Sequence, residues 1–405
     1  LAQRKFLLEG LICLRNALVT LGAPLLAIKA VDEQKAVDIA LKLSEQACEV
    51  VTDAAYLRQD RTFEENLNEK LIVKRRRLTR VEGNVCVPVT VLCAKPAFNA
   101  TTIRKVAWHL LEKLRLEKWD DTPNIHCETG SALLGGEDAA QKVLQEFIAS
   151  RLNSYDQGRP LCDTLQCMNI DMELSKAADA CKTSSALLGG EDAALKVLQE
   201  FIASRLNSYD QGRNVPIGEN QSFLSAYIHF GMLNPVDIVT EVQRSSVRKA
   251  AKDAFLEELV IRRELAHNFV YYYKDTYDTF DCLPDWAKKT MDEHRHDKRK
   301  HIYTYRELEE GRTHDPYWNA AQFELVYTHR NRPVFGKLRY MCAEGIQRKF
   351  RKHIDEYVRK NYERAGRELM PSNLLSKEKK DEVGEALGPK AKRARKSAPR
   401  RGLKT

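Results

Sequence analysis

Segments of strand length alternate with amphipathic helices over the first third of the chain, and this alternation limits the fold more than any other feature. Apolar residues recur at helical spacing over 6–18 and over 37–47, and Asp32 is placed to cap the second helix. The predicted strands cover 24–30, 49–53 and 85–92. Strands separated by helices predict a doubly wound parallel α/β sheet domain over 1–126. Because the chain opens inside a helical pattern, we expect this sheet to lack its first strand.

A long internal repeat follows this domain. Residues 131–159 recur as 185–213, and Gln141 against Leu195 is the single difference between the two copies. Each copy has the pattern of one helix. Two copies do not make a solenoid, which needs at least three repeats. A recent duplication, or an exon read twice in the gene model, explains them, and we assign 127–215 to a linker region that carries the duplicated helix.

The next part of the chain, 216–364, shows only helical patterns and predicts an all-α domain. The short motifs for nucleotide hydrolysis, hydride transfer and acyl transfer do not occur. The ten cysteines form no CxxC pair, so we expect reduced thiols and no metal site. No run of 18 apolar residues occurs, which argues against a membrane span.

Positive charge is concentrated at the end of the chain. The formal net charge is +9, and residues 388–405 contain eight cations and no acidic residue, so the rest is nearly neutral. We assign 365–405 to a basic disordered tail. It suits a nuclear import signal or an arm that contacts DNA phosphates, and a solvated terminus without a role is the simplest alternative. We expect a nuclear protein, with an organelle as a second destination.

One helical segment, 255–269, combines an apolar stripe with charged residues. The stripe consists of Phe255, Leu259, Ala266 and Phe269, and Arg262 and Arg263 interrupt it. Glu258 lies four residues before Arg262, so the simplest interpretation is an ion pair on a surface helix.

The order of residues in this segment, FLEELVIRRELAHNF, resembles the signature helix of the class II cyclobutane pyrimidine dimer photolyases. Other stretches resemble the same family: LSAYIHFG at 224–231, GRTHDPYWNAAQ at 311–322, PVFGKLRYM at 333–341, and parts of 6–11, 51–58 and 102–104. The resemblance covers the chain except for the insert between the repeats and the tail. On these motifs the chain is identified as a member of the photolyase/cryptochrome family.

The resemblance implies a monomeric lyase that uses FAD and light to split cyclobutane pyrimidine dimers in double-stranded DNA. The dimer must leave the duplex to reach the flavin, as in other enzymes that act on bases. The residues that match the family's catalytic positions are Glu258 and Trp318. Those that match its FAD-binding positions are Tyr209, Arg213, Leu224, Ser225, Tyr227, Arg262, Arg263 and Asn268. Those that match its DNA-binding positions are Arg262, Asn319, Gln322, Lys337 and Arg339.

The chain also departs from the family pattern. Only nine residues separate Gln322 from Arg332, where the family has a long segment that completes the flavin site. The repeat lies directly before the stretch that matches the flavin-phosphate segment. These departures leave two alternatives open: a non-repairing DNA-binding or light-signalling relative, and an inactive truncated product.

Overall fold

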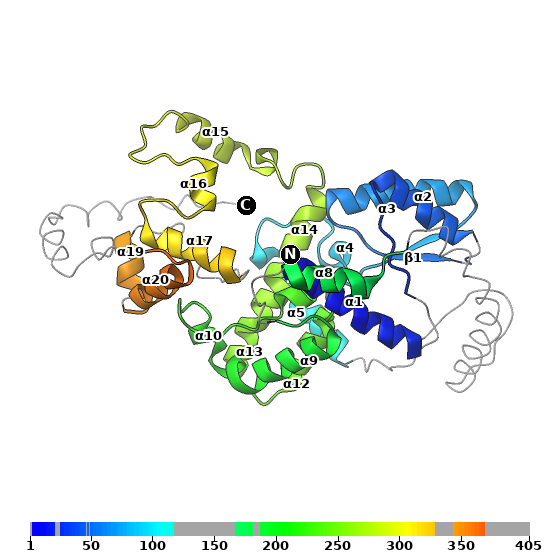
Figure 1. The fold of residues 1–405 in the computed structure, drawn as a ribbon, viewed down its shortest axis with the longest axis horizontal. Helices are drawn as coiled ribbons and strands as arrows, with labels where there is room; N and C mark the ends of the chain where they lie inside the picture. Colours follow the sequence, from blue (N-terminus) through cyan, green and yellow to red (C-terminus); the bar gives the residue numbers. More distant parts are fainter. Residues whose placement is uncertain are drawn as a thin grey trace, which may run out of the picture. The chain divides into compact units, whose positions relative to one another are not determined.

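The computed structural model describes 2–20, 25–45, 47, 49–116, 167–180, 187–328, 343–350 and 352–368 (Figure 1). The chain divides into two compact units. The first unit contains the chain up to Gln211 together with Asn220–Lys298, and the second contains Gly212–Glu219 and the chain from Arg299 onward.

The α/β part of the first unit begins with α1 (Ala2–Thr20), α2 (Glu33–Ser44), β1 (Val50–Asp53), α3 (Arg58–Val73) and β2 (Leu78–Val81). The strands are parallel, with Val50 opposite Leu78. Asp32 caps α2 by accepting a hydrogen bond from the backbone N–H of Lys35 at 2.7 Å. A small apolar cluster joins α2 to α3, and its buried members are Val37, Leu41, Leu67 and Leu71. The predicted parallel sheet is therefore present, with two strands in the part of the chain that the structure describes.

Two of the predicted strands differ from the structure. In 85–92 the last four residues form a helical turn, α4 (Val89–Leu92), and Val85, Cys86 and Val87 are all buried. Consecutive burial removes the inside–outside alternation that the sequence pattern suggested, because this segment packs against a helix instead of a strand. The segment 25–30 makes only an antiparallel bridge, between Ile28 and Cys167.

The remainder of the first unit is helical. Its elements are α5 (Ala100–Leu116), α8 (Ile170–Ala180), α9 (Glu191–Glu200), η2 (Phe201–Arg205), η3 (Leu206–Ser208), α10 (Tyr209–Gly212), α11 (Ser225–His229), α12 (Pro235–Arg244), α13 (Lys249–Leu256), η4 (Glu257–Arg262), α14 (Arg263–Tyr272), η5 (Phe280–Cys282) and α15 (Asp285–Glu293). The second copy of the repeat forms the continuous helical run from α9 to α10, as predicted. The first copy, 131–159, lies outside the described residues.

The signature segment lies within one long helix that runs from Lys249 to Tyr272 as α13, η4 and α14. Its α13 and η4 parts enter the largest apolar core through Phe255, Leu256, Val260 and Ile261. This burial fixes the helix in the centre of the first unit, where it can position side chains for a site.

The second unit contains α16 (Tyr305–Glu309), α17 (Pro316–Thr328), α19 (Ala343–Phe350) and α20 (Lys352–Arg364). Thr304 and Glu307 form a capping box at the start of α16. The core of this unit lies mainly between α17 and α20 and includes Tyr317, Ala321, Ile354, Tyr357 and Val358. Among the described helices of both units, none is long and apolar enough to cross a membrane.

Candidate functional site

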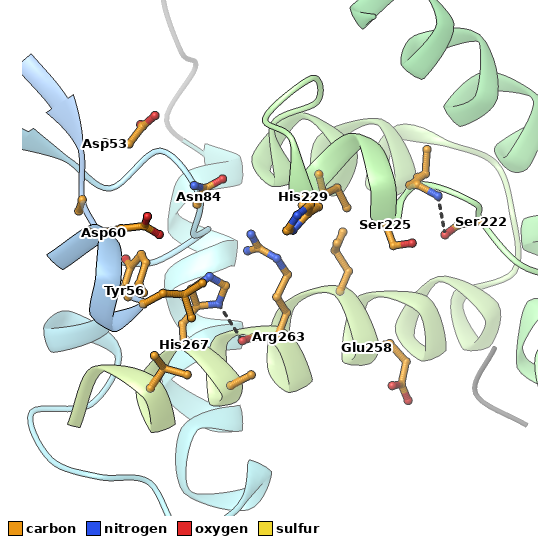
Figure 2. A pocket seen from close by; sticks show the side chains of 18 of the residues that line it. Asp53, Tyr56, Asp60, Asn84, Ser222, Ser225, His229, Glu258, Arg263 and His267 are labelled. Carbon is orange, nitrogen blue, oxygen red and sulfur yellow. Dashed lines mark hydrogen bonds between the residues drawn. The ribbon is translucent and has the colours of Figure 1, made fainter. Parts of the chain in front are cut away.

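A cavity of about 780 Å³ opens beside the long helix of the first unit. Its walls come from the end of β1 and the start of α3, from the segment before and within α11, and from the long helix itself. The polar residues that line it and are labelled in Figure 2 are Asp53, Tyr56, Asp60, Asn84, Ser222, Ser225, His229, Glu258, Arg263 and His267. The cavity thus joins the α/β part to the helical part of the first unit.

The long helix changes its hydrogen-bond pattern beside the cavity. Residues Glu257–Arg262 form a π-turn, a feature that occurs frequently at functional sites. The wider turn brings side chains five positions apart together, and Arg262 Nε lies 3.4 Å from Glu257 Oε1. Arg104 holds the same carboxylate through two hydrogen bonds of 2.7 and 3.1 Å. The ion pair expected between Glu258 and Arg262 is therefore replaced by one with Glu257, and Glu258 lines the cavity.

Three aromatic rings pack together, and two of them line the cavity. Phe255 lies 4.8 Å from Phe201 and 5.3 Å from Tyr209 between ring centroids, and Phe201 lies 5.8 Å from Tyr209. Phe201 begins the π-turn η2 in the second copy of the repeat. Tyr209 and Phe255 also line the cavity, so the repeat supplies part of its wall.

The other end of the cavity is polar and partly unsatisfied. Figure 2 shows Arg263 extending from the long helix, with Tyr56 and His267 on one side and Ser225 on the other. The buried Nη1 of Arg263 and the hydroxyl of Tyr56 have no hydrogen-bond partner in the described part of the chain, and Glu264 Oε1 lies 3.7 Å from that Nη1. Buried polar groups nearly always form hydrogen bonds in native proteins. These two atoms are enclosed by protein, whereas the Arg263 side chain as a whole is 20% exposed and lines the cavity.

The two rings beside Arg263 are held in defined states. His267 Nδ1 donates to the carbonyl oxygen of Arg263 at 3.0 Å, and the ring lies edge-on to Tyr56. Burial lowers the pKa of His267 below its ordinary value, which favours a neutral imidazole. Burial also raises the pKa of Tyr56, so its hydroxyl keeps its proton. At this end of the cavity the Arg263 guanidinium therefore lies beside a neutral imidazole and a protonated phenol, and Asp53 and Asp60 also line the cavity.

The face of α14 that points away from the cavity anchors the helix to the α/β part. Its three polar side chains, Glu264, Asn268 and Tyr272, follow each other at intervals of four residues, and we call them the anchoring face. Glu264 accepts a hydrogen bond from the backbone N–H of Cys86 at 2.8 Å. Asn268 accepts one from the backbone N–H of Ala97 at 2.7 Å and donates one to the carbonyl oxygen of Lys95 at 3.3 Å. Tyr272 donates one to the carbonyl oxygen of Cys93 at 2.9 Å. Glu264 and Asn268 are fully buried. The predicted flavin ligand Asn268 thus has an anchoring role in this structure.

The structure brings together only some of the predicted site residues. Those that line the cavity are Tyr209, Leu224, Ser225, Glu258 and Arg263. Tyr227 does not line it and is buried in the core, where its hydroxyl donates to the carbonyl oxygen of Leu188 at 2.9 Å. Arg262 points to the ion pair described above, and Arg213 belongs to the second unit.

The predicted residues on α17 belong to the second unit. Asn319 bonds to Thr313 and to the hydroxyl of Tyr362, and Gln322 donates to the carbonyl oxygen of Glu309 at 3.0 Å. Both side chains are buried and hold this unit together, and their contact with DNA stays a prediction. Trp318 is half-buried on the same helix, and its part in electron transfer stays a prediction. Lys337 and Arg339 lie outside the described residues.

Several cavity residues are not among the predicted site residues: Asp53, Tyr56, Asn84, His229 and His267. Asp53 ends β1, and ligands of open α/β sheets bind beyond the carboxyl ends of the strands. That rule is a usable signal for Asp53 and Tyr56. The sequence contains no comparable signal for His229 and His267. No group of metal-ligating side chains occurs among the residues that the structure describes.

Comparison with known proteins gives one consistent result. The sequence profile of the DNA photolyase family matches residues 1–124. The deoxyribodipyrimidine photo-lyase of Methanothermobacter thermautotrophicus is 29% identical, over 87% of this chain and 82% of that protein. The protein of the same name from Oryza sativa is 44% identical, but the match covers only 42% of this chain and 46% of that protein.

Solved structures give the same fold. A class III photolyase from Agrobacterium tumefaciens aligns with a TM-score of 0.55 and 17% identity, over 90% of this chain and 70% of that one. A Synechocystis cryptochrome aligns with a TM-score of 0.53 and 17% identity, over 90% of this chain and 71% of that one. A parallel sheet followed by a helical region is what these proteins share with the chain. Residues 1–124 match the DNA photolyase family, and the chain has the fold of photolyases and cryptochromes.

Proposed function

We propose that this protein is a light-driven, FAD-dependent lyase that splits cyclobutane pyrimidine dimers in DNA, of the class II type. One observation carries the proposal. Tyr209, Ser225, Glu258 and Arg263 come from three separate segments that match the family's flavin and dimer site, and they line one cavity. The names of the relatives support the same reaction.

The cavity suits a flavin in size and chemistry. Its volume of about 780 Å³ is within the range of roughly 300–1,000 Å³ that is usual for ligand pockets. Leu224, Ile228 and Leu259 offer apolar surface to a flat ring system. The guanidinium of Arg263, whose side chain lines the cavity and is 20% exposed, offers donors to its polar groups. We therefore assign FAD to this cavity.

The residues of the cavity would bind and orient, while the cofactor supplies the electron. Reduced FAD, when bound and excited by light, provides the single electron that no protein side chain can supply. Arg263 would bind an anionic or carbonyl oxygen of the bound molecules with its guanidinium group. Glu258, which lines the same cavity, would contact the pyrimidine rings of the dimer. The apolar residues would exclude water from the reacting ring.

The substrate would be double-stranded DNA from which the dimer is flipped out. Flipping is comparatively easy for a damaged base, because its stacking and pairing are already weakened. We propose that the protein acts as a monomer and that its basic tail directs it to the nucleus.

The test is a repair assay with the purified full chain, reconstituted with FAD and chemically reduced. We expect bound flavin after gel filtration, and loss of dimers from a duplex oligonucleotide under blue light but not in the dark. Glu258→Gln should reduce repair by at least about tenfold. The matched control is Glu257→Gln, because Glu257 is the adjacent residue and its carboxylate binds Arg104 and Arg262 outside the cavity wall.

Two results would contradict the proposal in different ways. A chain that binds flavin but repairs nothing in light would be a non-repairing relative. A folded chain that retains no flavin would show that the cavity is not a flavin site.

A further inference from the structure

Phe223 has a backbone conformation that an aromatic residue rarely adopts. Its φ is +61°, in the left-handed region, where a side chain is crowded by its own backbone and glycine is the usual residue. It lies directly between Ser222, labelled in Figure 2, and Leu224, and both of these neighbours line the cavity. A strained residue persists only where the surrounding structure holds it in place, and such residues are concentrated at functional sites. The contacts that hold Phe223 therefore bear on the cavity.

Arg205, the last residue of η2, contacts the segment around Phe223 at two points. Its Nε donates a hydrogen bond to the carbonyl oxygen of Gln221 at 3.1 Å. Its guanidinium carbon lies 5.3 Å from the centroid of the Phe223 ring, within the range of a cation–π interaction. The two contacts lie on either side of Ser222 in the sequence. Arg205 therefore holds both the chain before Ser222 and the ring after it.

Arg205 is itself held by the π-turn that it ends. Its Nη1 donates to the Glu200 carboxylate at 2.6 Å, and its guanidinium carbon lies 6.0 Å from the centroid of the Phe201 ring. Only 14% of its side chain is exposed, which strengthens its contacts with the rings. Phe201 packs in turn on Tyr209 and Phe255, which line the cavity. Arg205 thus connects two parts of the cavity wall, although it is not itself one of the lining residues.

The conformation of Phe223 determines how the chain enters α11. Leu224, the next residue, is the N-cap of α11 and is 1% exposed. Its N–H donates to Ser222 Oγ at 3.4 Å, and Ser225, the first residue of α11, also lines the cavity. A right-handed or extended conformation at Phe223 would redirect the chain on one side of it. Leu224 could then not stay in the core while Ser222 stays in the cavity wall.

We propose that Arg205 is a positioning residue of the cavity. By holding Phe223 in the left-handed conformation, it sets the positions of Ser222 and Ser225 and so the affinity of the cavity for its cofactor. The inference rests on the proposed flavin site and extends it to a side chain outside the cavity wall.

The experiment removes the arginine from the full chain with and without the strained residue. Arg205→Ala should weaken FAD binding about tenfold, through the loss of the cation–π contact and one hydrogen bond. Phe223→Gly should bind FAD much as the parent does, because glycine adopts a positive φ without a steric cost. The double variant should bind FAD nearly as Phe223→Gly does, and so more tightly than Arg205→Ala, since no strain is left for the arginine to hold. Phe223→Ala keeps the strain and loses the ring, so it should be as weak as Arg205→Ala.

A second readout does not need the flavin. In the protein without FAD, amide hydrogen exchange over 221–225 should rise in Arg205→Ala, whereas the same change in the Phe223→Gly background should have little effect. The matched control is Arg61→Ala. Arg61 lies 5.5 Å from the centroid of the Tyr271 ring and is 21% exposed, so its removal also deletes a partly buried cation from a ring in the first unit. This control should leave the FAD affinity and the exchange over 221–225 as in the parent.

Two results would overturn the proposal. In the first, Arg205→Ala leaves the FAD affinity as in the parent. In the second, Phe223→Gly restores neither the affinity nor the protection that Arg205→Ala loses, which would mean that Arg205 only stabilises the fold. A parent chain that binds no FAD would contradict the proposed function instead, and the exchange over 221–225 would then decide whether Arg205 positions the segment.

Discussion

Glu264 is a fully buried carboxyl group, and this makes the stability of the first unit depend on pH. Burial raises the pKa of Glu264 from 4.5 to about 7, and the negative charge of Glu82 acts in the same direction. The hydrogen bond from the Cys86 N–H and the positive charge of Arg263 act in the opposite direction but do not cancel the effect of burial. The folded state therefore binds this proton more tightly than the unfolded chain between about pH 4.5 and 7. By linkage, its contribution to the free energy of unfolding falls as pH rises through that window, by on the order of 3 kcal/mol in total.

Glu264→Gln should remove this slope, because glutamine keeps an acceptor for Cys86 and does not titrate. The measurement is urea unfolding of parent and variant across the window and one pH unit above it. Glu257→Gln, which removes a partly exposed carboxylate, should leave the slope as in the parent. If the difference in free energy of unfolding between parent and Glu264→Gln did not change with pH, Glu264 would be ionised in the folded protein across the whole window.

Arg263 and Arg262 are adjacent in sequence but have different surroundings, which gives a matched pair of substitutions. Arg263 lines the cavity and is 20% exposed, whereas Arg262 is 54% exposed and pairs with Glu257. Arg263→Lys should weaken FAD binding about 10- to 100-fold, because lysine cannot reproduce the planar donor geometry. Arg262→Lys should bind FAD as the parent does. Titration followed by flavin fluorescence measures both, and equal affinities for the two variants would exclude Arg263 as a ligand.

At the scale of elements, the anchoring face joins α14 to the 86–97 segment through backbone hydrogen bonds. Asn268→Ala would remove the partner of the half-buried Ala97 N–H and that of the Lys95 carbonyl oxygen. We expect a loss of roughly 2–6 kcal/mol in the free energy of unfolding, from two unsatisfied groups at about 1–3 kcal/mol each. The control is Asn66→Ala on α3, where the amide bonds to exposed Glu33 and the change should stay within about 0.5 kcal/mol. Equal losses from the two variants would show that the anchoring bonds contribute nothing.

The same elements show how far sequence can predict the fold and the site. The long helix is predicted correctly, because its apolar stripe and motif are local. Its π-turn cannot be predicted from the sequence. One extra residue in a single turn leaves the helical spacing of apolar residues such as Phe255 and Leu259 almost unchanged. The strand predicted over 85–92 is wrong. The alternating valines suggested a strand, but the burial of these residues depends on packing against α14. The partners of Glu264 and Asn268 are backbone atoms about 170 residues away, for which no side-chain pattern exists.

At the scale of the whole molecule, charge separates the body of the chain from its end. Eight of the cations lie in 388–405, and that stretch has no acidic residue. A protein that acts on nuclear DNA must enter the nucleus, and short Lys/Arg clusters of this kind act as import signals. The same cations could instead contact phosphates and release counterions, which would make DNA affinity depend more steeply on salt.

A fluorescent reporter fused to residues 388–405 should therefore concentrate in nuclei, and the same fusion with the eight cations replaced by glutamine should spread through the cell. Deleting 388–405 from the full chain tests the second role. The salt slope is the slope of the logarithm of affinity for undamaged duplex against the logarithm of salt concentration. If the tail binds phosphates, the steepness of this slope should fall by about 0.9 for every phosphate contact that the deletion removes. We expect the import result and an unchanged slope, because the tail is an addition to the part of the chain that carries the family motifs. A reporter that stays evenly distributed would contradict the nuclear assignment, and a flatter slope after deletion would assign the tail to DNA binding.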